Sequence, residues 1–144
     1  MLTAAVVARF VLLVRVRERL EEAATQRSIH DELTGLANRK FFIERIAFAH
    51  RSQLHTGTSF AVLFLDLDRF KSVNDTWGHA VGNEVLESAA RVLRSCVRSA
   101  DVVARVGGDE FAVLCENLES PQSAYSIADR IVARLGTELP NEAK

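Results

Sequence analysis

Apolar residues recur at helical spacing from the first positions of the chain. Their 4-3-4-3-4 spacing is that of a heptad seam with one charged member, and the positions are Val6, Phe10, Leu13, Arg17, Leu20 and Ala24. No proline or glycine occurs before Gly35, so the pattern predicts one helix running to about Ser28. The seam fits two arrangements equally, a helix packed on its own domain or a stalk that pairs with a second copy.

Residues 1–16 are apolar apart from Arg9 and Arg15. A membrane-spanning helix needs roughly 20 mostly apolar residues, so this stretch is too short as it stands. However, the arginines at positions 15, 17 and 19 are typical of the cytoplasmic flank of a membrane helix, and no cleavage site of a signal peptide is visible. We therefore expect a cytoplasmic protein, with a tether at the inner face of the membrane as the alternative.

Turn-forming residues at positions 31–36 end this first pattern. Asn38 then fits the N-cap of a second helix. The apolar face of that helix is formed by Phe41, Phe42, Ile46 and Ala49. Thr-Gly-Thr at positions 56–58 ends the helix, and the continuous apolar run at 60–65 predicts a buried central strand.

The second half of the chain predicts a helix, a hairpin and a last helix. A turn at residues 77–82 precedes helical spacing over 85–97. Two β-branched runs, at 102–106 and 112–114, read as the arms of a hairpin, and 124–135 as an amphipathic helix. The order α-α-β-α-β-β-α favours an α+β fold, a layered sandwich with a mostly antiparallel central sheet.

Composition narrows the classes of function. A chain of 144 residues with 48% hydrophobic content suits one domain with a core, plus an appendage. Eighteen basic and nineteen acidic residues give a net charge of -1, so no nucleic acid polymer is expected as a partner. Cys96 and Cys115 form no metal-binding pattern, and we expect both to be buried, reduced thiols.

Gly-Gly-Asp-Glu-Phe at residues 107–111 forms the tip of the predicted hairpin. Gly107 and Gly108 would let the phosphates of a ligand approach the backbone closely, and two adjacent carboxylates suit a hard cation such as magnesium. A type I′ turn with solvated acids is the simpler explanation of the same residues.

Asp66 follows the predicted strand directly, where it could face Asp109 across the sheet. The two carboxylates would hold one or two magnesium ions over a triphosphate, and Lys71 would offer a point charge to the phosphate oxygens. In the alternative interpretation, Asp66 and Asp68 cap the helix that follows.

The motifs together resemble the GGDEF family of bacterial diguanylate cyclases, from about His30 to Leu135. The matching segments are residues 31–39, 66–71, 74–75, 78–79 with Gly82, and 107–111. The resemblance implies a palm-like, nucleotidyl-cyclase-like fold. It also implies that two GTP molecules condense to cyclic di-GMP and release pyrophosphate, with one GTP held by each subunit of a dimer.

The resemblance carries roles onto individual residues. Asp66, the Leu67 carbonyl and Asp109 would bind Mg2+ or Mn2+. Asp109 and Glu110 would serve catalysis at the attacking 3′-hydroxyl, and Lys71 would stabilise charge on the phosphates. The substrate contacts implied are Phe70, Asn74, Asn83, Gly107 and Gly108, with Asn74 recognising guanine.

Two further positions bear on recognition and control. The family usually has Asp where this chain has Asn83, and an amide matches the two guanine protons less well than a carboxylate. Arg98 and Asp101 form an Arg-x-x-Asp that resembles the family's inhibitory site for its product. An i, i+3 ion pair is the structural alternative.

The family's domain continues beyond the equivalent of Lys144 with a strand, a hairpin and a helix that contacts GTP phosphates. We therefore expect residues 1–29 to be a helical stalk and 30–144 a GGDEF domain that is incomplete at its C-terminus. Arg39 is expected to pair with Asp31 where stalk and domain join.

Three hypotheses follow from this reading. The leading hypothesis is a product-inhibited diguanylate cyclase that forms a homodimer through the N-terminal helix. The alternatives are a catalytically impaired domain that binds cyclic di-GMP, and a coiled-coil interaction module with an inert GGDEF portion.

Overall fold

The computed structural model describes residues 29–139. The elements are β1 (Ala37–Asn38), α2 (Arg39–Thr56), β2 (Ser59–Asp66), α3 (Phe70–Trp77), α4 (His79–Ser95), β3 (Val102–Arg105), β4 (Glu110–Leu118) and α5 (Pro121–Glu138). The predicted N-terminal helix, its heptad seam and the suggested membrane segment lie outside these residues. No helix within 29–139 combines the length and the apolar character needed to cross a membrane.

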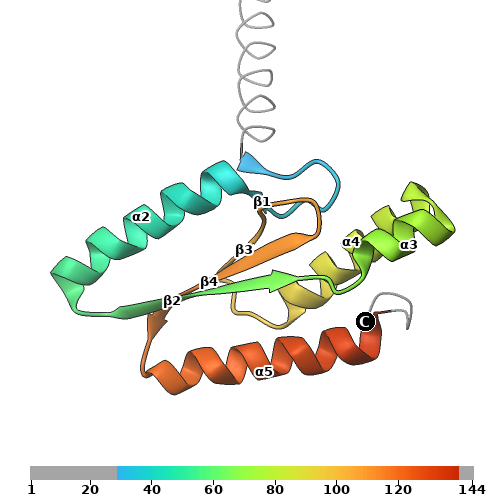
Figure 1. Ribbon diagram of the computed structural model, residues 1–144. Helices are drawn as coiled ribbons and strands as arrows, with labels where there is room; N and C mark the ends of the chain where they lie inside the picture. The colour runs from blue at the N-terminus through green and yellow to red at the C-terminus, as the bar shows by residue number, and fades with distance from the viewer. Residues whose placement is uncertain (1–28, 140–144) are drawn as a thin grey trace, which may run out of the picture.

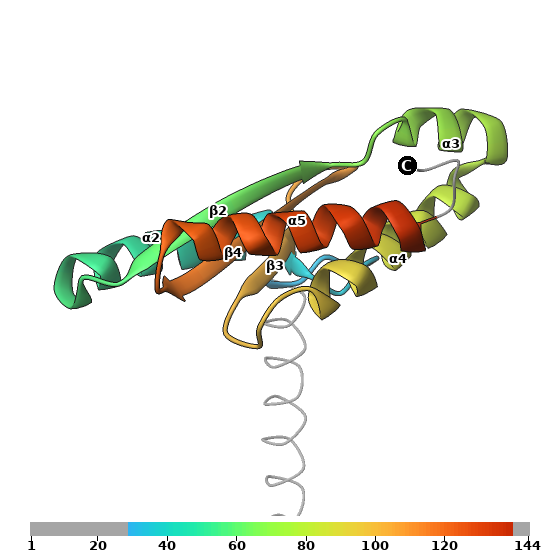
Figure 2. The same cartoon turned by 90° about the horizontal axis from the view of Figure 1, so that it is seen from below.

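The four strands form one sheet in the order β1-β3-β4-β2. β4 is antiparallel to both of its neighbours, and the short β1 runs parallel to β3. Helix α2 covers one face of the sheet, while α4 and α5 cover the other (Figures 1 and 2). The predicted layered α+β sandwich with a mostly antiparallel sheet is therefore confirmed.

Strand β4 is the centre of the core because both of its faces are covered. Phe111, Val113 and Cys115 belong to the apolar cluster shared with α4 and α5. Ala112 and Leu114 belong to the cluster beneath α2. Successive side chains of a strand point to opposite faces, so a run of five buried residues serves two layers at once.

The sequence marks the ends of α2 correctly. The Asn38 side chain accepts a hydrogen bond of 2.9 Å from the Phe41 amide, as an N-cap should. Gly57 ends the helix at φ 72°, and its amide bonds to the Gln53 carbonyl. This left-handed conformation is costly for residues with a Cβ, which explains glycine at this position.

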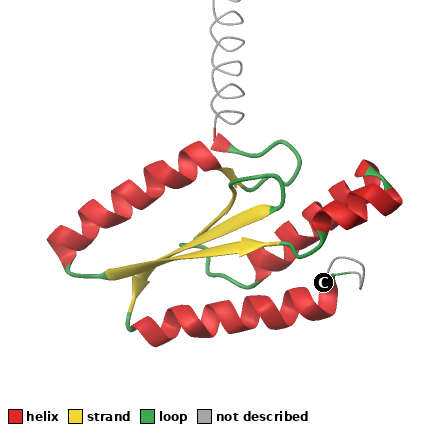
Figure 3. Ribbon diagram, in the orientation of Figure 1, coloured by secondary structure: helices red, strands yellow, loops and turns green. Residues whose placement is uncertain are grey.

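The main interpretation of the sequence predicted a loop and a turn where the structure has α3, and only the alternative, with Asp66 and Asp68 as caps, anticipated a helix there. The N-cap of α3 is Arg69 and no side chain caps it, so the helix is present without that capping role. The break between α3 and α4 is Gly78, at φ 85°. Gly82 lies inside α4 and is not part of the turn. Figure 3 shows the described helices and strands with the loops that join them. The two glycines were predicted to mark one turn, but they have different roles. Gly78 separates the two helices, whereas Gly82 lies within α4 and permits the close approach of α3.

The prediction that residues 60–65 form the central strand is wrong for the described part of the chain. β2 lies at the edge of the sheet and pairs only with β4, and Phe64 is 73% exposed. An apolar run of this length shows that a strand forms, but pairing partners far away in the sequence decide which strand lies in the middle.

Both cysteines are free and buried, as expected. Burial, with the Asp101 carboxylate nearby, raises the pKa of the Cys115 thiol to about 11. The thiol therefore stays protonated at neutral pH, and Cys115 serves packing, not nucleophilic chemistry.

Two phenylalanines on facing elements test this account of the core. Phe42 lies on the inner side of α2 and is 1% exposed, so we expect Phe42→Ala to lower the free energy of unfolding by about 3–5 kcal/mol. Phe64→Ala should change it by less than about 0.5 kcal/mol, because that ring is mostly in solvent. Denaturant unfolding measures both variants, and equal losses would contradict the assignment of the core.

Candidate functional site

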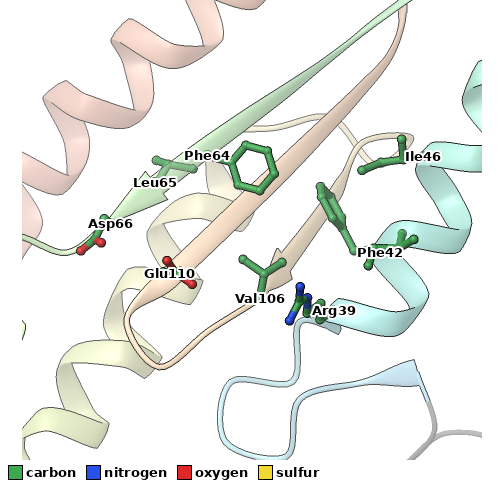
Figure 4. Close-up of a pocket in the computed structure, with 9 residues that line it drawn as sticks. Arg39, Phe42, Ile46, Phe64, Leu65, Asp66, Val106 and Glu110 are labelled. Atoms are coloured by element: carbon green, nitrogen blue, oxygen red, sulfur yellow. The ribbon is translucent and has the colours of Figure 1, made fainter.

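The candidate site lies where β2 ends and β4 begins. Asp66, the last residue of β2, pairs in register with Glu110, the first residue of β4. The next residues are also joined, since the Leu67 amide donates to the Asp109 carbonyl over 3.2 Å. Figure 4 shows Asp66 and Glu110 side by side at this end of the sheet. The sequence predicted that Asp66 would face Asp109. The structure instead places Glu110 opposite Asp66, with Asp109 one residue before it and joined to Leu67 through the backbone.

Directly opposed carboxylates repel each other, at a cost of about 0.2–1 kcal/mol for a cross-strand pair of like charge. A divalent cation beside Asp66 and Glu110 would offset this repulsion. Within residues 29–139, no three acidic, histidine or cysteine side chains gather as a complete metal cage. Mg2+ characteristically uses one or two carboxylates with water and substrate phosphates, so this partial set of oxygens fits that ion.

The hairpin tip is not a type I′ turn. That turn needs positive φ at both central residues, but within the described chain the glycines with positive φ are Gly35, Gly57 and Gly78. Gly107 makes room for the Glu110 side chain. A Cβ there would lie 2.2 Å from the Glu110 carboxylate, whereas a Cβ on Gly108 would meet nothing within 4 Å. Gly108 is therefore the open side of the tip.

Arg105 joins this tip to the turn at residues 31–36. Its guanidinium donates to the Gly108 carbonyl over 2.7 and 3.1 Å. The same group lies 3.3 Å from both carboxylate oxygens of Asp31. The prediction that Arg39 pairs with Asp31 is wrong, because the side chain that reaches Asp31 comes from β3.

The Asp31 carboxylate is also held by Thr34, whose amide and hydroxyl donate over 2.8 and 2.7 Å. Burial raises the pKa of this carboxyl, but the Thr34 hydrogen bonds and the Arg105 charge stabilise the ionised form more strongly. The net effect lowers the pKa of Asp31 below its ordinary value. Asp31 therefore stabilises the folded state as a carboxylate.

A short loop after Asp66 leads into α3. Arg69 adopts φ 60° there, a left-handed conformation that costs a non-glycine residue about 1–2 kcal/mol. The Phe70 amide donates to the Leu67 carbonyl over 3.2 Å, and the Phe70 ring is buried in the core. Lys71 follows on the exposed side of the first turn of α3.

Asn74 packs tightly against α4. A Cβ on Gly82 would lie 1.9 Å from the Asn74 side-chain oxygen, so only glycine admits the Asn74 side chain in this position. Asn83 is the next residue of α4 and is exposed. The two asparagines predicted to contact the base thus come from adjoining positions of the α3–α4 pair.

A cavity of about 420 Å³ opens beside the carboxylates, between β2 and α2. Asp66 and Glu110 stand at one end of it and Arg39 at the other, with Val106 between them and Phe42 on the same side as Arg39 (Figure 4). Lys71, Asn74 and Asn83 do not line this cavity, so the predicted base contacts lie outside it.

Arg98 and Asp101 lie at the opposite end of β3 from the hairpin tip, roughly 10–13 Å away along a strand of this length. The Arg98 side chain is 56% exposed and that of Asp101 is 0% exposed. The Asp101 oxygens accept bonds from the amides of Arg98 (2.9 Å) and Glu116 (3.3 Å). The Arg98 Nε also lies 3.5 Å from the Asp101 carboxylate, which is the i, i+3 ion pair of the structural alternative, and its guanidinium donates to the Glu116 carbonyl over 3.3 Å. Asp101 therefore fixes the local backbone and also holds the half-exposed Arg98 side chain.

Sequence reasoning missed three arginines at the site. Arg105 reaches Gly108, Arg39 lines the cavity, and Arg94 donates to the Gly35 carbonyl over 2.5 Å. The only sequence signal for Arg105 was its place two residues before the glycine pair. Arg39 and Arg94 act through tertiary contacts that no local pattern encodes.

Comparison with known proteins identifies the family to which this chain belongs. Residues 28–144 match the family described as "Diguanylate cyclase, GGDEF domain". The chain belongs to the GGDEF family. It is 49% identical over 106 residues to diguanylate cyclase TpbB of Pseudomonas aeruginosa. The matched region covers 74% of this chain and 24% of TpbB. The chain therefore spans about a quarter of the length of that relative.

Solved structures confirm the palm-like GGDEF fold. The coiled coil and GGDEF domain of DgcB from Caulobacter crescentus, solved in complex with c-di-GMP, is 32% identical with a TM-score of 0.80 and covers 89% of this chain and 66% of that one. A form of Pseudomonas aeruginosa TpbB comprising only the GGDEF domain is 45% identical with a TM-score of 0.74, over 80% and 67% of the two chains.

Gly82→Ala tests the contact between α3 and α4. The added methyl group must displace Asn74, so we expect the Asn74 side-chain amide resonances to shift and the free energy of unfolding to fall by about 1–3 kcal/mol. Gly136→Ala in α5 is the matched control, because a Cβ there meets nothing within 4 Å. That variant should be neutral or stabilised by up to about 1 kcal/mol, and equal behaviour of the two would refute the contact.

The lowered pKa of Asp31 predicts how stability depends on pH. A carboxyl whose pKa is lower in the folded state contributes stability that is present above the unfolded value, about 4, and is lost as the pH falls through the folded value. Asp31→Asn should therefore cost about 1 kcal/mol at pH 7 and progressively less below about pH 4. Urea unfolding at several pH values measures this, with Asp129→Asn on exposed α5 as the control. A difference that does not change with pH would contradict the prediction.

Proposed function

We propose that this chain is the nucleotide-condensing part of a diguanylate cyclase that converts two GTP into cyclic di-GMP and pyrophosphate. The observation that carries the proposal is the pairing of Asp66 with Glu110 across β2 and β4, with Asp109 joined to Leu67 beside them. Membership of the GGDEF family supports the same reaction.

In the proposed reaction, the 3′-hydroxyl oxygen of each GTP attacks the α-phosphorus of the other. Each attack forms one phosphodiester bond, breaks the bond to the β-phosphate and releases pyrophosphate. The attacking hydroxyl loses its proton to the Asp109–Glu110 pair. Mg2+ or Mn2+, held by Asp66, Asp109 and the Leu67 carbonyl, supplies charge neutralisation at the phosphates when bound.

Residues around the carboxylates would orient the nucleotide. Lys71, exposed on the first turn of α3, supplies a positive charge for phosphate oxygens. Gly108 gives the phosphates an open approach to the backbone. Phe70 supports this loop from within the core.

Asn74 and Asn83 would read the guanine edge. Asn74 is fixed against Gly82, so one partner of the base is preorganised. Asn83 offers one acceptor oxygen where a carboxylate would offer two, which weakens the discrimination of guanine from other bases.

The Arg98 region supports a second role, the binding of cyclic di-GMP as an inhibitory product. Arg98 is exposed, and its backbone amide is held by the buried Asp101. A guanidinium in this setting can stack on a base or pair with a phosphate. A chain that binds the product here without turning over GTP would be a receptor, which is the alternative function.

Two copies of the chain must meet for this reaction, because each contributes one GTP. We propose that the N-terminal helix, with its Leu13 and Leu20 seam, supplies the homodimer contact. Residues 1–29 would then be the stalk and 30–144 the catalytic part, at the cytoplasmic side of any membrane tether.

A crossed pair of variants tests the proposal. Incubation of the full chain with Mg2+ and GTP should yield cyclic di-GMP and pyrophosphate, detected by chromatography. Asp109→Asn should reduce turnover at least 100-fold and leave calorimetric binding of cyclic di-GMP within about twofold. Arg98→Ala should weaken cyclic di-GMP binding about 10-fold or more and leave Mg2+–GTP binding unchanged.

Each outcome of this experiment assigns a function. ATP in place of GTP is the substrate control, and its conversion at the same rate would refute guanine recognition. Binding of cyclic di-GMP without any turnover by a folded dimer would refute the cyclase and support the receptor. Failure to bind either nucleotide would leave only the interaction module.

A further inference from the structure

The backbone of Arg105 is held rigidly within the sheet. Its backbone lies in β3, paired with Asn38 of β1 on one side and Phe111 of β4 on the other. Its side chain is 16% exposed. The paired strand fixes the backbone of Arg105, and the bonds of its guanidinium to Asp31 and Gly108 fix the side chain.

The first partner of Arg105 is the turn at residues 31–36, the point where the N-terminal segment joins the domain. That turn is closed by the Gly35 amide on the Asp31 carbonyl (2.9 Å) and the Asp31 amide on the Leu36 carbonyl (2.8 Å). Because the Asp31 carboxylate is also fixed by Thr34, displacement of this turn displaces the anion that Arg105 holds.

The second partner is the Gly108 carbonyl at the tip of the hairpin. Among the described residues, Arg105 is the one side chain bonded to that carbonyl. The neighbouring Asp109 carbonyl bonds to the Leu67 amide, so a shift of Gly108 is passed to the candidate site. A shift of about 1 Å in such a site can cost on the order of 100-fold in rate.

We propose that Arg105 is a positioning residue that makes the placement of the Gly108–Asp109 backbone depend on the Asp31 turn. Its planar fork of donors holds a carboxylate and a carbonyl at once. A lysine at position 105 would keep the charge but could not hold both groups. For catalysis the inference rests on the proposed function, whereas the coupling itself does not.

Hydrogen exchange without nucleotide tests the coupling in the full chain. Asp31→Asn and Arg105→Lys should each speed exchange of the Leu67 amide, which is bonded to the Asp109 carbonyl, by about fivefold or more, the effect expected from weakening that hydrogen bond. The double variant should be no faster than either single variant, since both remove the same link. Additive effects, or no change at the Leu67 amide in Asp31→Asn, would overturn the proposal.

Arg94→Gln is the matched control for general loosening of the turn. It removes another arginine bond to the same turn, at the Gly35 carbonyl, but has no link to the hairpin. Exchange at the Leu67 amide should stay within about twofold of the original chain. An effect equal to that of Asp31→Asn would mean that the turn acts through overall stability and would refute a role for Arg105.

Calorimetry with Mg2+–GTP extends the test to the site. Asp31→Asn and Arg105→Lys should each weaken binding about three- to tenfold, without a further loss in the double variant. Unchanged affinity in Arg105→Lys would refute the positioning role. If the original chain binds no GTP, the proposed function fails, while the exchange experiment still decides whether Arg105 couples the two turns.

Discussion

The pairing of β4 with a strand on each side is the constraint on which the rest of the structure depends. It buries residues 111–115 between two helical layers, and it sets the register that places Asp66 opposite Glu110. A shift by one residue would turn Phe111 toward α2 and Ala112 toward α4 and α5. The candidate site is therefore a by-product of core packing, since the same register that fills the core also opposes two carboxylates at its end.

Local signals in the sequence predicted most helices and strands correctly, but they did not predict which strands pair with one another in the sheet. Asn38 and Gly57 identified the ends of α2 because caps act within a few residues. The run at residues 60–65 correctly predicted a strand but not its place at the edge of the described sheet. Central position depends on partners about 50 residues away, and no local pattern contains that information.

The candidate site shows the same division between local and distant information. Asp66, Asp109 and Glu110 were evident from residue type and position, but the register of β2 and β4 opposes Asp66 to Glu110 and not to Asp109 as predicted. Arg105 was overlooked because its partners, Asp31 and Gly108, are separated by 77 positions in the chain. The glycines were recognised as important, but the reasons at Gly82 and Gly107 are side chains packed against them from other parts of the fold.

The two charged residues of the Arg-x-x-Asp motif differ in burial, because Asp101 is buried and Arg98 is half-exposed. The Asp101 carboxylate accepts hydrogen bonds from backbone amides in the loop before β3 and in β4, so it stabilises this corner of the sheet. Arg98 shares this corner of the sheet, because its Nε lies 3.5 Å from the Asp101 carboxylate and its guanidinium donates to the Glu116 carbonyl. A substitution at position 101 would remove the bonds to the backbone and the ion pair together, whereas one at position 98 would remove only side-chain contacts of a half-exposed residue. The two charged positions of the motif therefore differ in how much of the fold depends on them.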